Sequence, residues 1–409
     1  MKKFSGPRVT TGCALFIIII MSGSGLYSAG YSKLAETFHT SMSHLGFYSM
    51  LLTISGIICS VSLTSLKQKI TLKGVLTLDA LVLYAVALCA KLLGDQLLTL
   101  LVFFISVGTT LSLGAHVVMT EIVSNWYVEK RAEKISLMLG CALIGQALYQ
   151  SVGGYVFSHM ELLDGWFLLY LVNGTLLLLI NHFLIIATDP KDVGQEAFGI
   201  PATVDSAERA PTCGEAHCGL YRRKAFWLCL LGDWGLSGGV NFITTYATTF
   251  FARNGISLQV SAAILSCATI SAAIFSFLNG RFLKWLKVKK YVALLLGSVI
   301  LGNLMMIVYG ILPQPIIIAL IILFYGIGYS GAHCINIDSG IIFSAEDAAD
   351  ANSKISGLAM SGGLLLLSLS GYLVDHVGFA AVYLVIIALA VISLISYELA
   401  LSVSPKEQN

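Results

Sequence analysis

The sequence predicts an all-α membrane protein with twelve transmembrane helices arranged as two pseudo-symmetric six-helix bundles. The first reason is composition: charged residues make up 11% of the chain and hydrophobic residues 57%. A soluble domain usually carries about twice that share of charged residues, so this chain cannot build an ordinary water-facing surface. The other two reasons are a series of long apolar segments and a repeat that relates the two halves of the chain.

The apolar segments are long enough to cross a bilayer, because roughly 20 residues of helix span the hydrocarbon core. Short polar islands separate them. We place the spans at residues 11–32, 44–66, 73–93, 97–122, 133–157, 165–187, 225–251, 258–280, 290–312, 315–342, 353–375 and 379–402.

The basic residues predict the orientation. With the N-terminus on the cytoplasmic side, all but three of the 24 Lys and Arg residues fall in cytoplasmic segments or at cytoplasmic helix ends. The exceptions are Lys33, Lys91 and Arg253. Because cytoplasmic loops are enriched in Lys and Arg, we expect a multi-pass protein of the plasma (inner) membrane with both termini in the cytoplasm.

The longest polar segment predicts the division of the chain. It follows the sixth span and contains Pro190, Pro201 and Pro211 without helical or strand periodicity. A segment of this length is usually a linker. We therefore expect an N-terminal bundle over residues 1–188, a cytoplasmic linker over 189–224 and a C-terminal bundle over 225–409.

The two halves share a short sequence pattern. The tripeptide Gly114-Ala115-His116 in the fourth span recurs as Gly331-Ala332-His333 in the tenth. An acidic residue follows each copy at the same distance, Glu121 in the first half and Asp338 in the second. Halves repeated in parallel orientation are typical of carriers that hold their substrate between two bundles near the bilayer midplane.

Two segments carry a family resemblance. The loop Trp126-Tyr127-Val128-Glu129-Lys130-Arg131-Ala132 resembles the W-F-x-x-R/K-R-G loop of the major facilitator superfamily, and Gly165-Trp166-Phe167 resembles that superfamily's start of the sixth span. Together they are most similar to the branch of monocarboxylate transporters and oxalate:formate antiporters. The resemblance implies the major facilitator fold, spans one, four, seven and ten around a central cavity, and an organic anion as substrate.

Ionisable residues inside the spans are candidates for proton coupling or gating, because a charge at the bilayer centre costs about 2.5–3.5 kcal/mol even on lenient scales. Histidine titrates near neutral pH and can carry a proton during transport. A buried residue that only ties helices together is the alternative for each. The candidates are His116, Glu121, Asp233, His333 and Asp338.

Aromatic and amide side chains within the spans are candidates for substrate binding. Ligand pockets are commonly lined by aromatic residues with a few convergent polar groups. Helix packing or a place in the interfacial belt is the alternative for any single aromatic residue. The candidates are Tyr27, Tyr31, Gln146, Tyr149, Asn241, Tyr325, Tyr329 and Asn336.

These observations favour a secondary active transporter, proton-coupled or working by exchange. The chain has no G-x-x-x-x-G-K-[ST] motif for ATP and no H-E-x-x-H or G-x-S-x-G motif, so ATP-driven transport by this chain alone is excluded and an enzyme is not expected. We expect no cofactor, no metal and no nucleic acid, and we interpret Cys213 to Cys218 as part of a solvated loop rather than a zinc site.

The substrate remains open between two classes. The resemblance implies a small organic acid, a monocarboxylate-like anion, moving with a proton or in exchange for a counter-substrate. The acidic residues Asp233 and Asp338 suit a neutral or cationic compound equally well, which leaves proton-coupled efflux as an alternative. A transporter-like sensor that does not transport is the third hypothesis. Membrane lipid is the expected surroundings in every case.

Overall fold

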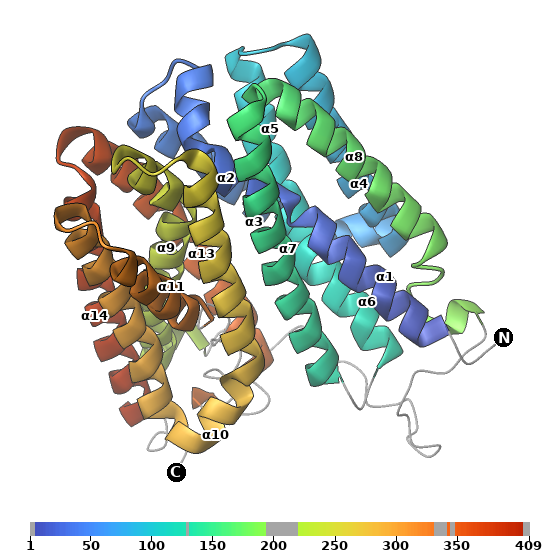
Figure 1. The fold of residues 1–409 in the computed structure, drawn as a ribbon. Coiled ribbons are helices and arrows are strands. Elements are labelled where there is room, and N and C mark those ends of the chain that lie inside the picture. The colour runs from blue at the N-terminus through green and yellow to red at the C-terminus, as the bar shows by residue number, and fades with distance from the viewer. Residues whose placement is uncertain (1–4, 128–130, 194–219, 331–341, 344–347, 404–409) are drawn as a thin grey trace.

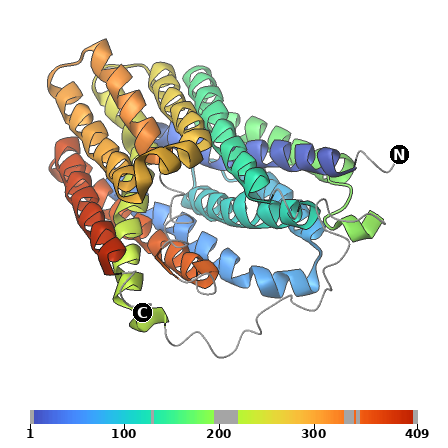
Figure 2. The ribbon, with the colours of Figure 1, turned by 90° about the horizontal axis from the view of Figure 1, so that it is seen from below.

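The computed structural model describes residues 5–127, 131–193, 220–330, 342–343 and 348–403, and within them the chain is helical with no strand. Figure 1 shows two helical bundles side by side, one coloured blue to green and the other yellow-green to red. The view from below shows the same division (Figure 2). The predicted fold class, an all-α membrane protein of twelve spans, is confirmed.

The first bundle contains the helices up to α8. They are α1 (Ser5–Ile20), α2 (Ser22–Thr37), α3 (Met42–Lys69), α4 (Leu72–Leu92), α5 (Leu97–Thr110), the π-helix η2 (Leu111–Val118), α6 (Met119–Trp126), α7 (Arg131–His159) and α8 (Leu162–Phe183). The first predicted span is divided into α1 and α2 at Met21, and the fourth consists of α5, η2 and α6.

The second bundle contains α9 (Lys224–Arg253), α10 (Leu258–Ile311), α11 (Pro315–Ser330), α13 (Ala348–His376) and α14 (Phe379–Val403). The short 3-10 helices η3 (Pro190–Val193) and η4 (Leu220–Arg222) lie at the two ends of the predicted linker, whose residues 194–219 are outside the described part. The position of the domain boundaries stays a prediction.

Spans eight and nine are two helical limbs that meet at a sharp turn, so the connection is shorter than the loop that the sequence predicted over residues 281–289. Both belong to α10, which turns at Lys287, where φ is 60° and ψ is 160°. The segment from Arg281 to Lys290 contains neither Gly nor Pro, and Lys, Leu and Arg are good helix formers. Helical structure therefore persists on both sides of the turn.

Local signals explain where several helices begin. Ser41, Thr71 and Ser257 precede α3, α4 and α10, and each side-chain hydroxyl accepts a hydrogen bond from the backbone N–H three residues later. Such caps satisfy amides that have no partner within the helix. Within the described residues, seven helical segments are long and apolar enough to cross a membrane.

The motif residues of the first bundle are structural. Trp126 is fully buried, and its indole N–H donates a hydrogen bond to the carbonyl oxygen of Ala187 at 3.2 Å. Trp166 stacks on Phe103 with ring centroids 4.1 Å apart. These contacts fix the ends of α6 and α8 against their neighbours, so the family-like segments position the bundle rather than the site.

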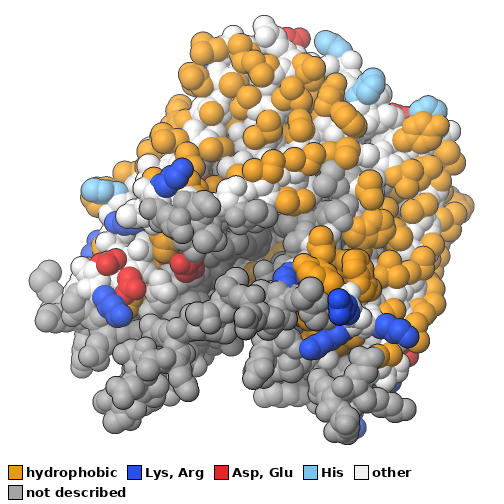
Figure 3. Space-filling view, turned by 180° about the vertical axis from the view of Figure 1, so that it is seen from behind, with side chains coloured by type: hydrophobic (Ala, Val, Ile, Leu, Met, Phe, Trp, Pro, Cys, Tyr) orange, Lys and Arg blue, Asp and Glu red, His pale blue; other side chains and the backbone are white. Residues whose placement is uncertain are grey.

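The surface agrees with a membrane environment. Many large apolar side chains are exposed along the helices, among them Phe47, Leu88, Leu171 and Ile274. In Figure 3 hydrophobic side chains dominate the upper part of the visible face, and most of the visible Lys and Arg side chains lie in its lower half. We call this lower end, where α1 and α9 begin and α10 turns, the basic end, and the opposite end the far end.

Candidate functional site

Two glutamines on α7 join the bundles near the middle of the helices. The Tyr329 hydroxyl on α11 donates to Oε1 of Gln146 at 2.9 Å, and the Thr269 hydroxyl on α10 donates to Oε1 of Gln150 at 2.9 Å. Both glutamines are buried. Gln150 Nε2 also donates to the Ser28 hydroxyl on α2 at 3.3 Å. We call Gln146, Gln150, Thr269 and Tyr329 the amide cluster.

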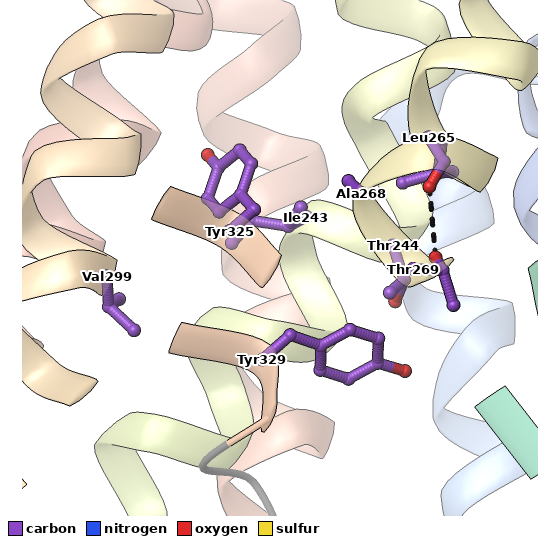
Figure 4. Close-up of a pocket in the computed structure, with 8 residues that line it drawn as sticks. All are labelled: Ile243, Thr244, Leu265, Ala268, Thr269, Val299, Tyr325 and Tyr329. Atoms are coloured by element: carbon purple, nitrogen blue, oxygen red, sulfur yellow. Dashed lines mark hydrogen bonds between the residues drawn. The ribbon is translucent and has the colours of Figure 1, made fainter. Parts of the chain in front are cut away.

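A small pocket adjoins the amide cluster on the side of the second bundle. It lies between α9, α10 and α11, and Figure 4 shows Tyr325 and Tyr329 extending from α11 on one side with Thr244 and Thr269 on the other. Its volume is about 20 Å³, whereas the smallest cavity that holds one water measures about 10–15 Å³. An organic solute therefore fits here only after the helices separate.

The described side chains around this pocket are uncharged. Its lining consists of Ile243, Thr244, Leu265, Ala268, Thr269, Val299, Tyr325 and Tyr329. Amides and hydroxyls both donate and accept hydrogen bonds. Chemically, this part of the site can bind hydroxyl, carbonyl or protonated carboxyl groups when its own hydrogen bonds open.

A second set of contacts closes the space between the bundles toward the far end. Tyr31 on α2 donates to the Tyr246 hydroxyl on α9 at 3.2 Å, and Tyr246 donates to the carbonyl oxygen of Leu367 on α13 at 3.3 Å. Thr248 on α9 donates to the carbonyl oxygen of Ser28 at 2.8 Å. Tyr27 packs on Tyr31 with ring centroids 5.4 Å apart.

At the surface of the far end, a carboxylate of the second bundle caps a helix of the first. Asp375, in the last turn of α13, accepts hydrogen bonds from the backbone N–H and the hydroxyl of Ser43, each at 2.7 Å. Ser43 lies in the first turn of α3, where backbone amides have no partner within the helix. Ser368 adds a hydrogen bond to the carbonyl oxygen of Gly46 at 3.3 Å. We call the Ser43–Asp375 pair the far-end latch.

The structure brings some of the predicted binding residues together and separates others. Gln146 meets Tyr329 directly across the two bundles. The Tyr149 hydroxyl instead donates to Asn173 at 2.6 Å within the first bundle, and the Tyr325 hydroxyl donates to Asn303 at 3.3 Å within the second. Tyr27 and Tyr31 belong to the aromatic contact near the far end.

The predicted coupling residues are only partly described. Asp233 is buried on α9 with 6% of its surface exposed, and Glu121 is partly exposed on α6. His116 falls within η2, and Asn241 lies on α9, but their side chains are outside the described part. Residues His333, Asn336 and Asp338, and the segment Cys213 to Cys218, also lie outside it. The roles of all these residues remain predictions.

Sequence reasoning did not find the partners of the amide cluster or the far-end latch. Thr269 is one of many hydroxyl residues in the spans, and such residues ordinarily bond to the carbonyl one turn back, as Thr269 also does to Leu265 at 3.0 Å. Ser43 and Asp375 lie at helix ends, where polar residues are expected. The π-helix η2 was not predicted either, although π-helical turns often occur at functional sites.

Comparison with known proteins identifies the family to which this chain belongs. The sequence profile of the Major Facilitator Superfamily matches residues 13–341. The chain belongs to this superfamily. Membership identifies a multi-pass membrane transporter rather than an enzyme and supports secondary transport by alternating access between the two bundles. No curated protein matches the chain by sequence.

Solved structures of similar fold come from several kinds of transporter. A bacterial homologue of the human lysosomal transporter Spinster, in an inward-facing and unoccupied conformation, shares 16% identity at a TM-score of 0.74, covering 99% of this chain and 98% of that chain. A D-xylose–proton symporter shares 13% identity at a TM-score of 0.74, covering 96% of each chain. The nucleoside transporter NupG shares 17% identity at a TM-score of 0.70, covering 97% of this chain and 98% of that chain.

These likenesses establish the fold of this major facilitator protein and leave its substrate class open. The family prediction is confirmed by the profile match over residues 13–341. The narrower prediction of the monocarboxylate and oxalate:formate branch stays a prediction.

Proposed function

We propose that this major facilitator protein moves a small organic acid together with a proton, or in exchange for a counter-substrate, through a site at the amide cluster. The observation that carries the proposal is a pair of buried hydrogen bonds at the amide cluster that cross between the bundles, Tyr329 to Gln146 and Thr269 to Gln150. These bonds must open when the bundles rock apart, and a bound solute can then replace them.

The chemistry of the described lining favours a solute that crosses without net charge. A carboxylate buried among amides and hydroxyls loses its hydration without gaining a counter-charge, which is costly. A carboxylic acid accompanied by its proton avoids that cost, because its hydroxyl donates and its carbonyl accepts. The proposal therefore combines the organic acid expected from the resemblance with proton coupling.

The same lining supports a second candidate, proton-coupled transport of a neutral polar compound. All eight residues around the pocket of Figure 4 are uncharged, as are the two glutamines beside it. A neutral solute with several hydroxyl groups can satisfy both glutamines without any counter-charge. Efflux of such a compound is the corresponding alternative to uptake of an acid.

Asp233 is our proposed proton carrier among the described residues. It lies on α9, one of the helices that contribute to the pocket, and it is buried. An intramembrane carboxyl on a helix beside the pathway is a candidate for proton relay. His116, Glu121, His333 and Asp338 remain proposed coupling or gating residues on the basis of their positions in spans four and ten.

The proposed orientation places the basic end in the cytoplasm of the cell, in the plasma (inner) membrane, with residues 189–224 as a cytoplasmic linker between bundles over 1–188 and 225–409. The distribution of Lys and Arg supports this. The described hydrogen bonds between the bundles extend from the amide cluster to the far end, and on the basic side Gly140 of α7 still packs against Phe277 of α10. The hydrogen bonds support a carrier that is closed at the far side, with the cytoplasm as the side to which the site would open.

Uptake into proteoliposomes tests the proposal. Labelled monocarboxylates, neutral polyols and cationic dyes are supplied with and without an inward-acid pH gradient. We expect acid uptake that rises with the gradient and a loss of this gradient dependence in Asp233→Asn, while exchange of labelled for unlabelled acid persists. Uptake of polyols alone would favour the second candidate. Binding without movement of any solute would support a sensor and contradict both.

A further inference from the structure

A second cavity lies at the basic end, away from the far-end contacts. It is enclosed by the two limbs of α10 and by α11, and its volume is about 320 Å³. This is many times the roughly 10–15 Å³ that a cavity needs to hold one water molecule. Its lining includes the apolar side chains of Phe275, Phe282, Trp285, Leu294 and Ile327.

The walls of this cavity are apolar and open toward the lipid-facing surface. Trp285 is 78% exposed and Leu294 is 37% exposed, although both line the cavity. The polar residue Asn279 is already engaged, since its amide donates to the carbonyl oxygen of Ser330 at 3.1 Å. The cavity therefore offers an apolar surface to a hydrocarbon chain rather than hydrogen bonds to a polar solute.

Four exposed cations lie beside lining residues of the cavity along the chain. They are Arg281, Lys287, Lys289 and Lys290, all on α10. The whole of α10 contains no acidic residue, so its own sequence supplies no counter-charge. Lys287 adopts a φ of 60°, a conformation that residues with a Cβ atom rarely adopt. This turn is what folds the second limb of α10 back beside the first and creates the cavity between them.

We propose that this cavity and its four cations bind one anionic phospholipid. The acyl chain enters the apolar cavity, Trp285 lies at the level of the glycerol region, and the phosphate is held by Arg281, Lys287, Lys289 and Lys290. Basic residues beside a cytoplasmic loop attract anionic headgroups, and tryptophan is enriched at the interface between hydrocarbon and water. Positive charge alone is typical of a cytoplasmic loop; the adjacent cavity is what indicates a site for an individual lipid.

Quenching of tryptophan fluorescence by brominated lipid tests the proposal directly. The full-length protein is reconstituted in phosphatidylcholine vesicles, and a phospholipid with dibrominated acyl chains is added either as phosphatidylglycerol or as phosphatidylcholine. The contribution of Trp285 is the difference between the native protein and Trp285→Phe. We expect phosphatidylglycerol to quench this contribution at a mole fraction several-fold lower than phosphatidylcholine. Equal quenching by the two lipids would overturn the proposal.

Two variants separate the headgroup from the chain. Replacing Arg281, Lys287, Lys289 and Lys290 by Gln should abolish the preference for phosphatidylglycerol. Ile327→Phe fills the cavity but keeps every charge, so it should reduce quenching by brominated phosphatidylglycerol severalfold. If quenching is unchanged in Ile327→Phe, the chain does not enter the cavity and the proposal fails.

A matched control tests whether total charge explains the result. Exposed cations elsewhere at the basic end are replaced by Gln in equal number, namely Lys69, Lys191, Arg222 and Lys224. This control should retain the preference. If it loses the preference as fully as the α10 variant does, binding is a property of the charged surface as a whole, and the site is refuted. Circular dichroism of each variant confirms that the helices are intact.

Discussion

At the scale of the single residue, the hydroxyl group of Tyr329 links the two bundles. Tyr329 is carried by α11 of the second bundle, yet its hydroxyl donates to Gln146 of the first. One helical turn earlier, Tyr325 donates to Asn303 within its own bundle. Two tyrosines on one helix thus contact different bundles. Of these two, Tyr329 is the one whose hydrogen bond breaks when the bundles separate.

Tyr329→Phe should weaken solute binding by about 2- to 10-fold, because one hydrogen bond contributes roughly 0.5–1.5 kcal/mol. The phenyl ring keeps the packing, so the thermal unfolding temperature should change little. The measurement is the dissociation constant for whichever solute the uptake screen identifies. Tyr84→Phe is the control, since its hydroxyl bonds Thr175 within the first bundle. An equal loss in both variants would show that Tyr329 has no special place in the site.

At the scale of the helix, glycine permits the close packing that holds the amide cluster in place. A Cβ atom on Gly25 of α2 would lie 2.6 Å from Tyr149 Cβ and 2.7 Å from the carbonyl oxygen of Gln146, both on α7. Gly297 on α10 is the opposite case, because no atom lies within 4 Å of its ideal Cβ position. The close approach of α2 to α7, which carries the two glutamines, is therefore possible only because residue 25 has no side chain.

Gly25→Ala should destabilise the protein by about 1–3 kcal/mol, the usual cost of overpacking a filled interface. Gly297→Ala should leave stability unchanged or raise it by up to about 1 kcal/mol, since alanine is favoured over glycine in an open helical position. Thermal unfolding followed by tryptophan fluorescence in detergent measures both. A similar unfolding temperature in the two variants would contradict the packing argument.

Hydropathy predicted the helices well because the bilayer fixes their length. The predicted span 379–402 is α14 (Phe379–Val403), and the predicted span 73–93 is α4 (Leu72–Leu92). The break at Met21 and the π-helix η2 were missed, because hydropathy continues unbroken across them. Gln146 and Tyr329 stood out as polar and aromatic residues within spans, but their pairing depends on how the bundles dock, which no local pattern encodes.

At the scale of the whole molecule, the contacts between bundles determine which side is closed. They include the aromatic contact of Tyr31 with Tyr246 and the far-end latch of Ser43 with Asp375. The latch is the outermost of these. It combines a carboxylate with the positive end of a helix dipole, an arrangement that is favourable near a helix N-terminus. Opening toward the far side must break it.

Asp375→Asn should increase the population that is open at the far end by about tenfold or more, because a hydrogen bond to a charged group contributes about 1.5–3 kcal/mol. Spin labels at Thr40 and Asn254, in connections of different bundles, report the opening as a longer distance in double electron–electron resonance. The nine native cysteines are first replaced. Glu36→Gln is the control, because Glu36 pairs with Lys33 on its own helix. Identical distance distributions in Asp375→Asn and the control would exclude the latch.

The far-end latch also sets an energy scale for the transport cycle. A hydrogen bond of this kind is worth about 1.5–3 kcal/mol, and moving one elementary charge through a membrane potential of 100 mV releases about 2.3 kcal/mol. The two quantities are of the same order. Under the proposed proton coupling, one proton would supply enough work to open the far side once per turnover, while thermal motion alone opens it only rarely. A closure of this strength would limit leakage and would still be reversible by a driving force of the size of one charge in the membrane potential.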